Sequence, residues 1–247
     1  MIASLGMYDR AETAISNDVF WECIRKNLGY GPENLDRVSE VMQVWQSPDL
    51  LFSQTCGLPF RTILHDKVQL VGTPDYGFSG IAPGFYYSVF VVRKEASDVV
   101  EDFRDRVFAC NEIGSQSGWA APQNHAQTLG FGFENVTLTG GHLASAGAVA
   151  NGLADIAAID AQTWRMICKY RDYTGALKVI AKTQPTPGLP YITSLTQDAG
   201  AIFGVVKATI QNLNEETRRV LGITGIVSID KSEYLRVPNP KAPLRIA

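Results

Sequence analysis

Apolar positions along the chain fall into short β-like runs and longer stretches with helical spacing. An apolar run at 2–7 leads into apolar positions near helical spacing from Ile15 to Leu28, and Gly29 stops this pattern. Apolar runs of strand length follow at residues 50–53, 68–71, 85–93, 107–110, 136–138, 156–159, 177–181 and 191–194. Helical patterns at 95–105, 142–150 and 198–221 alternate with them. This alternation predicts an α/β fold with largely parallel sheets.

The clearest local pattern lies between residues 136 and 159. A β-branched run is followed by the alanine-rich stretch His142–Ala150, which Asn151 and Gly152 close, and then by a second apolar run. This order predicts a strand, a helix and a parallel strand joined by a right-handed crossover. Gly and Pro mark residues 54–59 and 183–190 as loops.

Length and charge narrow the function classes. With 247 residues, the chain is long enough for one large domain or for two lobes that each bury a core. The formal net charge is -3 and no basic run tracks a phosphate backbone, so nucleic acid is not an expected partner. Polar residues also break every apolar run before it could span a bilayer.

Residues of the kind that form metal and catalytic sites are scattered. The four cysteines include no CxxC pair, and the three histidines show no metal spacing, so we expect neither a metal nor a cofactor. Nucleophile-elbow, phosphate-loop and zinc-protease motifs do not occur, so no catalytic residue is predicted. The start, MIASLGMYD, lacks the basic and apolar regions of a secretory signal, which leaves a cytosolic protein or a removed leader open.

Polar residues follow several predicted strands at the point where each strand ends. In open parallel sheets, ligands bind beyond the carboxyl ends of the strands, where loops meet helix starts. The candidate ligand-binding residues at such positions are Tyr8, Thr55, Ser115, Gln116, Ser117, His142 and Asp160.

The loop Ser115–Gly118 is the most informative of these positions. Hydroxyl groups and backbone N–H groups at a helix start form a cradle for an oxyanion, without a lysine. The competing interpretation is that one serine serves only as an N-cap. Pro122 removes a backbone donor near the start of this helix and predicts a short or bent segment.

Two further side chains, His142 and Asp160, could complete such a site. His142 follows Gly140 and Gly141 at the next helix start, where an imidazole can donate to an anion or merely cap and pack locally. Asp160 ends a strand and could accept from a cationic or protonated part of a ligand, or cap the helix at Thr163, or do both. The tyrosines that could line a cleft, or simply be buried, are Tyr8, Tyr76, Tyr86 and Tyr87.

Several stretches together resemble the phosphate, phosphite and phosphonate substrate-binding proteins of ABC importers, in the periplasmic-binding-protein type II superfamily. The stretches are Met7–Asp9, Phe52–Pro59, Tyr86–Arg93, Gly114–Gly118 and, above all, Thr139–Trp164. The resemblance implies that Ser115, Gln116, Ser117, His142 and Asp160 contact the ligand. It implies a contribution of Tyr8 and Thr55 from the other lobe more weakly.

The resemblance also implies an architecture. It predicts two α/β lobes joined by two crossover strands near Tyr86–Arg93 and Gly188–Ser194, with a ligand cleft between the lobes. Lobe one would be discontinuous, with residues 1–88 and 191–247, and lobe two would hold residues 89–190. The implied function is capture of a small phosphorus oxyanion by hinge closure, in a periplasmic monomer that serves an ABC permease.

Two departures from the family pattern keep alternatives open. Gln116 places a longer amide where the family commonly has a hydroxyl, which alters the anions that fit. The chain begins directly at its first strand, so a cytosolic role stays open. One alternative is a cytosolic enzyme on this fold with His142 and Asp160 as an acid/base pair. The other is a ligand-sensing subunit of a regulatory system.

Overall fold

The described residues, 1–241 and 245–246 of the computed structural model, form two compact units. Unit 1 holds Met1–Phe85 and Pro187–Arg236, and unit 2 holds Tyr86–Thr186 with the described part of 237–247. The first two passages between the units therefore come after residues 85 and 186, not after 88 and 190 as expected. The described residues make a third, unpredicted passage after Arg236, because Arg245 and Ile246 pair with a strand of unit 2.

Unit 1 is built on a mixed sheet with the strand order β1-β2-β11-β3-β12. The strands are β1 (Ile2–Ser4), β2 (Leu50–Gln54), β11 (Tyr191–Ser194), β3 (Val68–Asp75) and β12 (Gly225–Val227). β1 and β2 are parallel, whereas β11 is antiparallel to both β2 and β3, and β12 is antiparallel to β3. The prediction of largely parallel pairing is wrong for this unit, because β11 returns from the other unit in the opposite direction.

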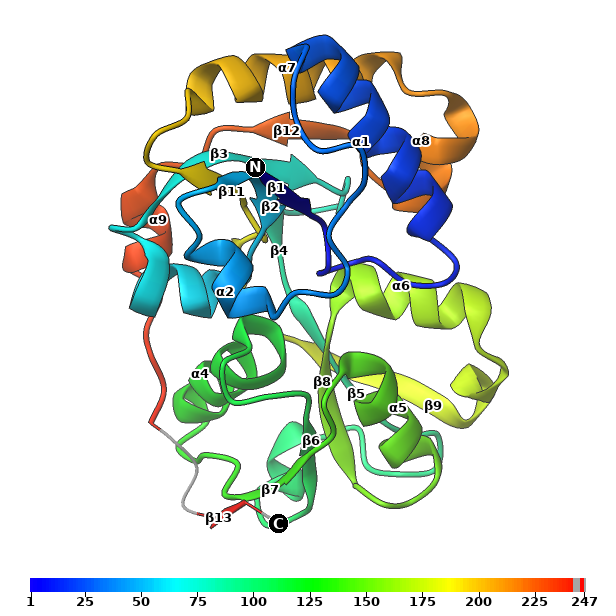
Figure 1. Cartoon of the computed structure of the whole chain (residues 1–247). Coiled ribbons are helices and arrows are strands. Elements are labelled where there is room, and N and C mark those ends of the chain that lie inside the picture. Colours follow the sequence, from blue (N-terminus) through cyan, green and yellow to red (C-terminus); the bar gives the residue numbers. More distant parts are fainter. Residues whose placement is uncertain (242–244, 247) are drawn as a thin grey trace. The chain divides into compact units, whose positions relative to one another are not determined.

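Helices cover both faces of this sheet (Figure 1). One face carries α1 (Ala14–Leu28), α7 (Ala199–Asn212) and α8 (Glu215–Leu221). The other face carries α2 (Val41–Trp45), α3 (Gly57–Pro59) with the π-helix η1 (Phe60–Leu64), and α9 (Lys231–Leu235). A core of buried residues joins the second group to the sheet, and it includes Trp45, Phe60, Ile192 and Tyr234.

Several sequence predictions need correction. The predicted loop at 54–59 is helical from Gly57, because Pro59 lies in the first turn, where a missing N–H removes no intrahelical bond. The helical pattern at 95–105 yields only the 3-10 helix η2 (Val100–Phe103). The run at 85–93 is divided at Tyr87 into β4 (Phe85–Tyr86) and β5 (Ser88–Arg93). Neither β12 nor α9 was predicted.

Unit 2 contains a second sheet with the order β13-β7-β6-β8-β5-β9. The strands are β13 (Arg245–Ile246), β7 (Asn135–Leu138), β6 (Phe108–Cys110), β8 (Ile156–Asp160), β5 (Ser88–Arg93) and β9 (Leu177–Lys182). The first four are parallel neighbours, and β5 is antiparallel to β8 and β9. The predicted parallel pair β7 and β8 has the right direction, but β6 lies between the two strands.

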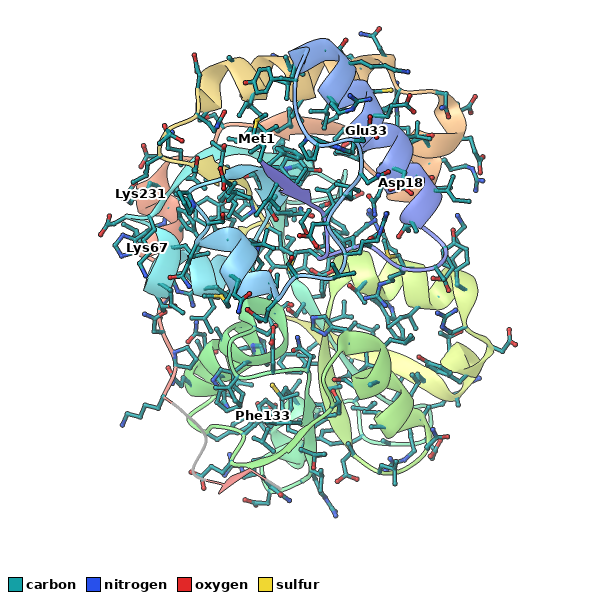
Figure 2. All side chains as sticks on the ribbon, viewed as in Figure 1. Met1, Asp18, Glu33, Lys67, Phe133 and Lys231 are labelled. Carbon is teal, nitrogen blue, oxygen red and sulfur yellow. The ribbon has the colours of Figure 1, made fainter. Side chains whose placement is uncertain are left out.

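Helices also cover both faces of the second sheet (Figure 1). The π-helix η3 (Gln116–Ala120) and α4 (Ala121–Thr128) lie on one face, whereas α5 (His142–Ala150), α6 (Ala161–Tyr170) and η4 (Asp172–Ala176) lie on the other. On the α4 face, Phe133, labelled in Figure 2, stacks on Phe108 with ring centroids 4.5 Å apart. Such stacking adds to the area that aromatic rings bury. The predicted helix 142–150 is confirmed.

The first and second passages of the chain are held together by a two-stranded sheet. β4 (Phe85–Tyr86) pairs with β10 (Thr186–Pro187), and the backbone N–H of Gly188 donates to the carbonyl of Gly84 at 2.8 Å.

In the part of the chain that the structure describes, every helix is too short or too polar to cross a membrane.

Candidate functional site

The helix start after β6 carries the first group of predicted site residues. Ser115 is the N-cap, and its Oγ accepts the backbone N–H of Gly118 at 2.9 Å. The hydroxyl uses a lone pair for this bond and keeps an O–H to donate, so capping and ligand binding are compatible roles. Ser115, Gln116 and Ser117 are all at most 4 % exposed. Their backbone N–H groups belong to the first turn, where N–H groups point out of the helix end.

The first turn of this helix is wider than an α-turn. The carbonyl of Ser115 accepts from Ala120 at 3.0 Å and also from Trp119 at 3.2 Å. The carbonyl of Gln116 accepts from Ala121, and the bonds from Ala120 and Ala121 have the π-helical spacing. The carbonyl of Ser117 accepts instead from the hydroxyl of Ser88 on β5 at 2.8 Å. Single-turn π-helical segments are common at functional sites.

The second helix start follows β7. Gly140 has φ +79, a left-handed conformation that favours glycine, and it turns the chain into α5. The N–H of Gly140 donates to the carbonyl of Asn111 and the N–H of Thr139 to that of Cys110, each at 2.9 Å. These two bonds hold the loop after β7 against the loop after β6. His142 is then the first residue of α5.

A side-chain hydrogen bond joins the two helix starts. Oγ of Ser117 lies 2.8 Å from Nε2 of His142. If Nε2 carries the proton, the ring donates to Ser117 and the serine O–H remains a donor for a third group; in the other tautomer, Ser117 donates to the ring. Ser115 Oγ lies 3.4 Å from Ser117 Oγ, so the two hydroxyls and the imidazole form one continuous polar group.

The absence of a side chain at Gly118 leaves room for the side chains of Asn111 and His142 beside the helix start. A Cβ at position 118 would lie 1.7 Å from Oδ1 of Asn111 and 3.2 Å from Cε1 of His142. The glycine is therefore required by close approach and not by its backbone conformation. Asn111, which the sequence did not single out, is packed against the helix start on one side.

Asp160 ends β8 at the same edge of the sheet. Its Oδ1 accepts the backbone N–H of Thr163 at 2.6 Å, so it is the N-cap of α6, and it is 2 % exposed. The helix dipole of α6 stabilises a negative charge at this position. In the β5–β8 ladder, Asp160 is the partner of Ser88.

Unit 1 holds the remaining predicted residues, Tyr8 and Thr55. Tyr8 follows β1 and meets Tyr76 edge-to-face, with ring centroids 5.4 Å apart. The amide of Gln54 donates to the hydroxyl of Tyr76 at 3.3 Å. Thr55 follows β2, is fully buried, and donates its N–H to the carbonyl of Pro190 at 3.0 Å.

The loop that carries Tyr8 is held at several points. The hydroxyl of Thr13 donates to the carbonyl of Tyr8 at 2.6 Å, and the carboxylate of Asp9 accepts from Asn17 at 3.0 Å. Arg37 also donates to Asp9, and this hydrogen bond raises the pKa of the guanidinium above its usual value. The polar contacts around Asp9 therefore fix the position of Tyr8 within unit 1.

The structure thus brings Ser115, Gln116, Ser117 and His142 together and places Asp160 one strand away, next to Ser88 in the ladder. Tyr8 and Thr55 belong to the other unit, and their part in the site remains a prediction. Within residues 1–241 and 245–246, His, Cys, Asp and Glu side chains do not gather in groups of three that could hold a metal.

Comparisons with known proteins show the family and the fold of the chain. A sequence profile of the family described as "ABC transporter, phosphonate, periplasmic substrate-binding protein" matches residues 55–234. No curated protein sequence matches the chain.

Solved structures with the same fold include PhnD1 of Prochlorococcus marinus in complex with methylphosphonate, with 16 % identity, TM-score 0.69 and 94 % of each chain covered. A binding-protein component of an ABC phosphonate transporter from Pseudomonas aeruginosa has 17 % identity and TM-score 0.68, with 94 % of this chain and 83 % of that one covered. XAC2383 of Xanthomonas citri, bound to ATP, has 14 % identity and TM-score 0.68, with 96 % and 94 % covered.

Proposed function

The chain belongs to the family of periplasmic substrate-binding proteins of phosphonate ABC transporters, and from this membership we propose that it binds a small phosphonate or phosphate at the paired helix starts of unit 2. It is a solute-binding protein of an ABC importer with the periplasmic-binding-protein type II fold. The family is one of transport proteins and not of enzymes. We propose that this chain acts in the periplasm and delivers its ligand to an ABC permease.

The observation that carries the proposal is the 2.8 Å contact between Ser117 Oγ and His142 Nε2. This contact supports a site in which the first-turn N–H groups and the positive dipole ends of two neighbouring helix starts face one oxyanion. Converging neutral donors suit a phosphonate, whose three oxygens each accept several hydrogen bonds. The hydroxyls of Ser115 and Ser117 and the imidazole of His142 add donors in the same place.

Gln116 and Asp160 bear on the ligand class. The amide of Gln116 reaches farther than a serine hydroxyl and offers two N–H donors at the centre of the loop, which favours an oxyanion with separated oxygens. Asp160 supplies a buried acceptor for a donor on the ligand, either an ammonium group or a remaining P–OH proton. The methylphosphonate in the structure of PhnD1 supports a small phosphonate as the ligand.

Unit 1 contributes two of the proposed ligand-binding residues. We propose that Tyr8 and Thr55 complete the site when the two units close over the ligand by a hinge movement. The ring of Tyr8, held edge-on by Tyr76, offers an apolar surface to the organic substituent and a hydroxyl to the oxyanion.

The test is a thermal-shift and calorimetric titration of the purified protein with methylphosphonate, 2-aminoethylphosphonate, phosphate, sulfate and acetate. At a hundredfold excess over the dissociation constant, a ligand adds about 2.7 kcal/mol of apparent stability. We expect this gain with phosphorus oxyanions, and its loss in Ser117→Ala and in His142→Ala. Stabilisation by acetate alone, or by a phosphonate in equal measure in both variants, would contradict the proposed site.

A further inference from the structure

Pro122, in the first turn of α4, has no backbone N–H, and a residue of strand β5 supplies a hydrogen-bond donor in its place. In the wide turn, carbonyls bond to N–H groups five residues ahead: Ser115 to Ala120, and Gln116 to Ala121. The next pair in this series would be Ser117 and residue 122. Residue 122 is a proline and has no N–H, so the carbonyl of Ser117 has no donor in the π-helical series.

Ser88 supplies the missing donor. Its hydroxyl donates to the carbonyl of Ser117 at 2.8 Å, and both residues are buried, with exposures of 1 % and 4 %. A buried carbonyl without a partner is unfavourable, so this bond fixes the orientation of the Ser117 peptide. Ser117 also places its hydroxyl 2.8 Å from Nε2 of His142. The orientation of the Ser117 peptide therefore affects the geometry of the Ser115, Ser117 and His142 side chains.

Ser88 is itself fixed from two sides. Its N–H donates to Oγ1 of Thr183 at 2.9 Å, and the N–H of Thr183 donates to the carbonyl of Ser88 at 2.9 Å. On its other side, Ser88 is the ladder partner of Asp160. Ser88 lies three residues after Phe85, where the chain first leaves unit 1. Thr183 lies three residues before Thr186, where the chain returns to unit 1.

We propose that Ser88 is a positioning residue of the oxyanion site. It replaces the donor that Pro122 removes, holds the wide turn of Ser115–Gly118 open to the ligand, and ties that turn to both chain segments that pass between the units. This inference rests on the proposed oxyanion function. Ser88 acts through Ser117 and is not proposed to touch the ligand.

The test compares dissociation constants for methylphosphonate and phosphate in single and double variants. Ser88→Ala leaves the Ser117 carbonyl without its donor, and we expect binding about five- to tenfold weaker. Pro122→Ala provides an N–H at position 122, and alone it should change the constant less than about twofold. In Ser88→Ala with Pro122→Ala, the new N–H replaces the lost hydroxyl, so affinity should return to within about threefold of the wild type.

A matched control separates positioning from general stability. Thr193, in unit 1, is fully buried and its hydroxyl donates to the carbonyl of Leu51 at 2.8 Å, a bond of the same kind and length. Thr193→Val should lower the melting temperature without changing the dissociation constant. An unchanged constant in Ser88→Ala, or a double variant as weak as Ser88→Ala, overturns the inference.

Two other outcomes are distinguishable from these. If Ser88→Ala does not fold, the double variant carries the test, since its carbonyl again has a donor, and weak binding there overturns the inference. If the wild type binds no phosphorus oxyanion, the proposed function itself is wrong. The inference about Ser88 is then wrong as well, because it rests on that function.

Discussion

Ser117 and His142 lie 25 residues apart in the sequence, yet Oγ of one and Nε2 of the other are 2.8 Å apart. Each stands in the first turn of a helix that follows a parallel strand, and the strands β6 and β7 are direct neighbours. Adjacent parallel strands place their carboxyl ends side by side, so the two helix starts meet at one edge of the sheet. The contact is a direct product of this topology.

Ser115 allows capping and anion binding to be measured separately. Ser115→Ala removes the cap of the helix start and should cost about 1 kcal/mol of unfolding free energy. Ser115→Asp retains a capping oxygen but adds a negative charge beside the anion. We expect its stability without ligand to stay within about 0.5 kcal/mol of the wild type, while phosphonate binding weakens at least about tenfold. Chemical denaturation and calorimetry measure the two quantities, and retained affinity in Ser115→Asp would argue against an anion there.

Gly118→Ala tests the close approach at the helix start. The added methyl would collide with Asn111 and press on the ring of His142, so we expect a loss of about 1 to 3 kcal/mol and weaker binding. Shortening the neighbour in Gly118→Ala with Asn111→Ala should recover a large part of both losses, because the colliding atom is removed. Additive effects of the two substitutions in denaturation experiments would contradict this arrangement.

Asp160→Asn separates the charge of this residue from its cap. Asparagine is as good an N-cap as aspartate, so α6 should remain intact and stability should change little. If Asp160 accepts from a ligand ammonium, affinity for 2-aminoethylphosphonate should fall about tenfold more than affinity for methylphosphonate. Calorimetry with the two ligands gives the ratio, and equal losses for both would exclude this role.

The thiol of Cys110 provides a pH-dependent probe of strand β6, which leads into the helix start at Ser115. Burial raises the pKa of Cys110 to about 12, so at pH 8 only about one molecule in ten thousand carries the reactive thiolate. Since the folded-state pKa exceeds that of the unfolded chain, the stability from burying the neutral thiol is present below about pH 8.5 and is lost as pH rises towards 12.

We therefore expect Cys110 to resist iodoacetamide in the native protein at pH 8, whereas exposed Cys168 is modified. Peptide mapping after alkylation identifies the labelled cysteines, and denaturant should make Cys110 reactive. Rapid native labelling of Cys110 would contradict the burial of β6.

Sequence reasoning succeeded where the local signal was strong. The helix 142–150 and the strand at 191–194 match the predicted bounds, because Gly and Asn residues flank the first and a proline-rich loop precedes the second. The predicted helix start at Ser115 is confirmed, and Pro122 lies in the first turn of the α-helix that follows the π-helical segment. The strand order could not be predicted, since β6 enters between β7 and β8 from earlier in the chain.

The missed residues depend on distant partners. Ser88 is a small polar residue inside the run FYYSVFVVR, where only the terminal Arg93 is charged, and this interruption of an apolar strand was the one available signal. Its role depends on a carbonyl 29 residues away that a proline has left without a helical donor. Asn111 likewise contacts Gly118 through its side chain and accepts the N–H of Gly140 at its carbonyl. These contacts form only when the sheet folds, so the sequence alone could not indicate them.

The third passage of the chain, after Arg236, has a practical consequence for reporting on ligand binding. β1 belongs to unit 1, but β13, the last strand among the described residues, pairs with β7 in unit 2. Donor and acceptor fluorophores attached beside β1 and beside β13 are therefore carried by different units. Energy transfer between them would report any ligand-dependent change in the distance between the units, without a label near the anion.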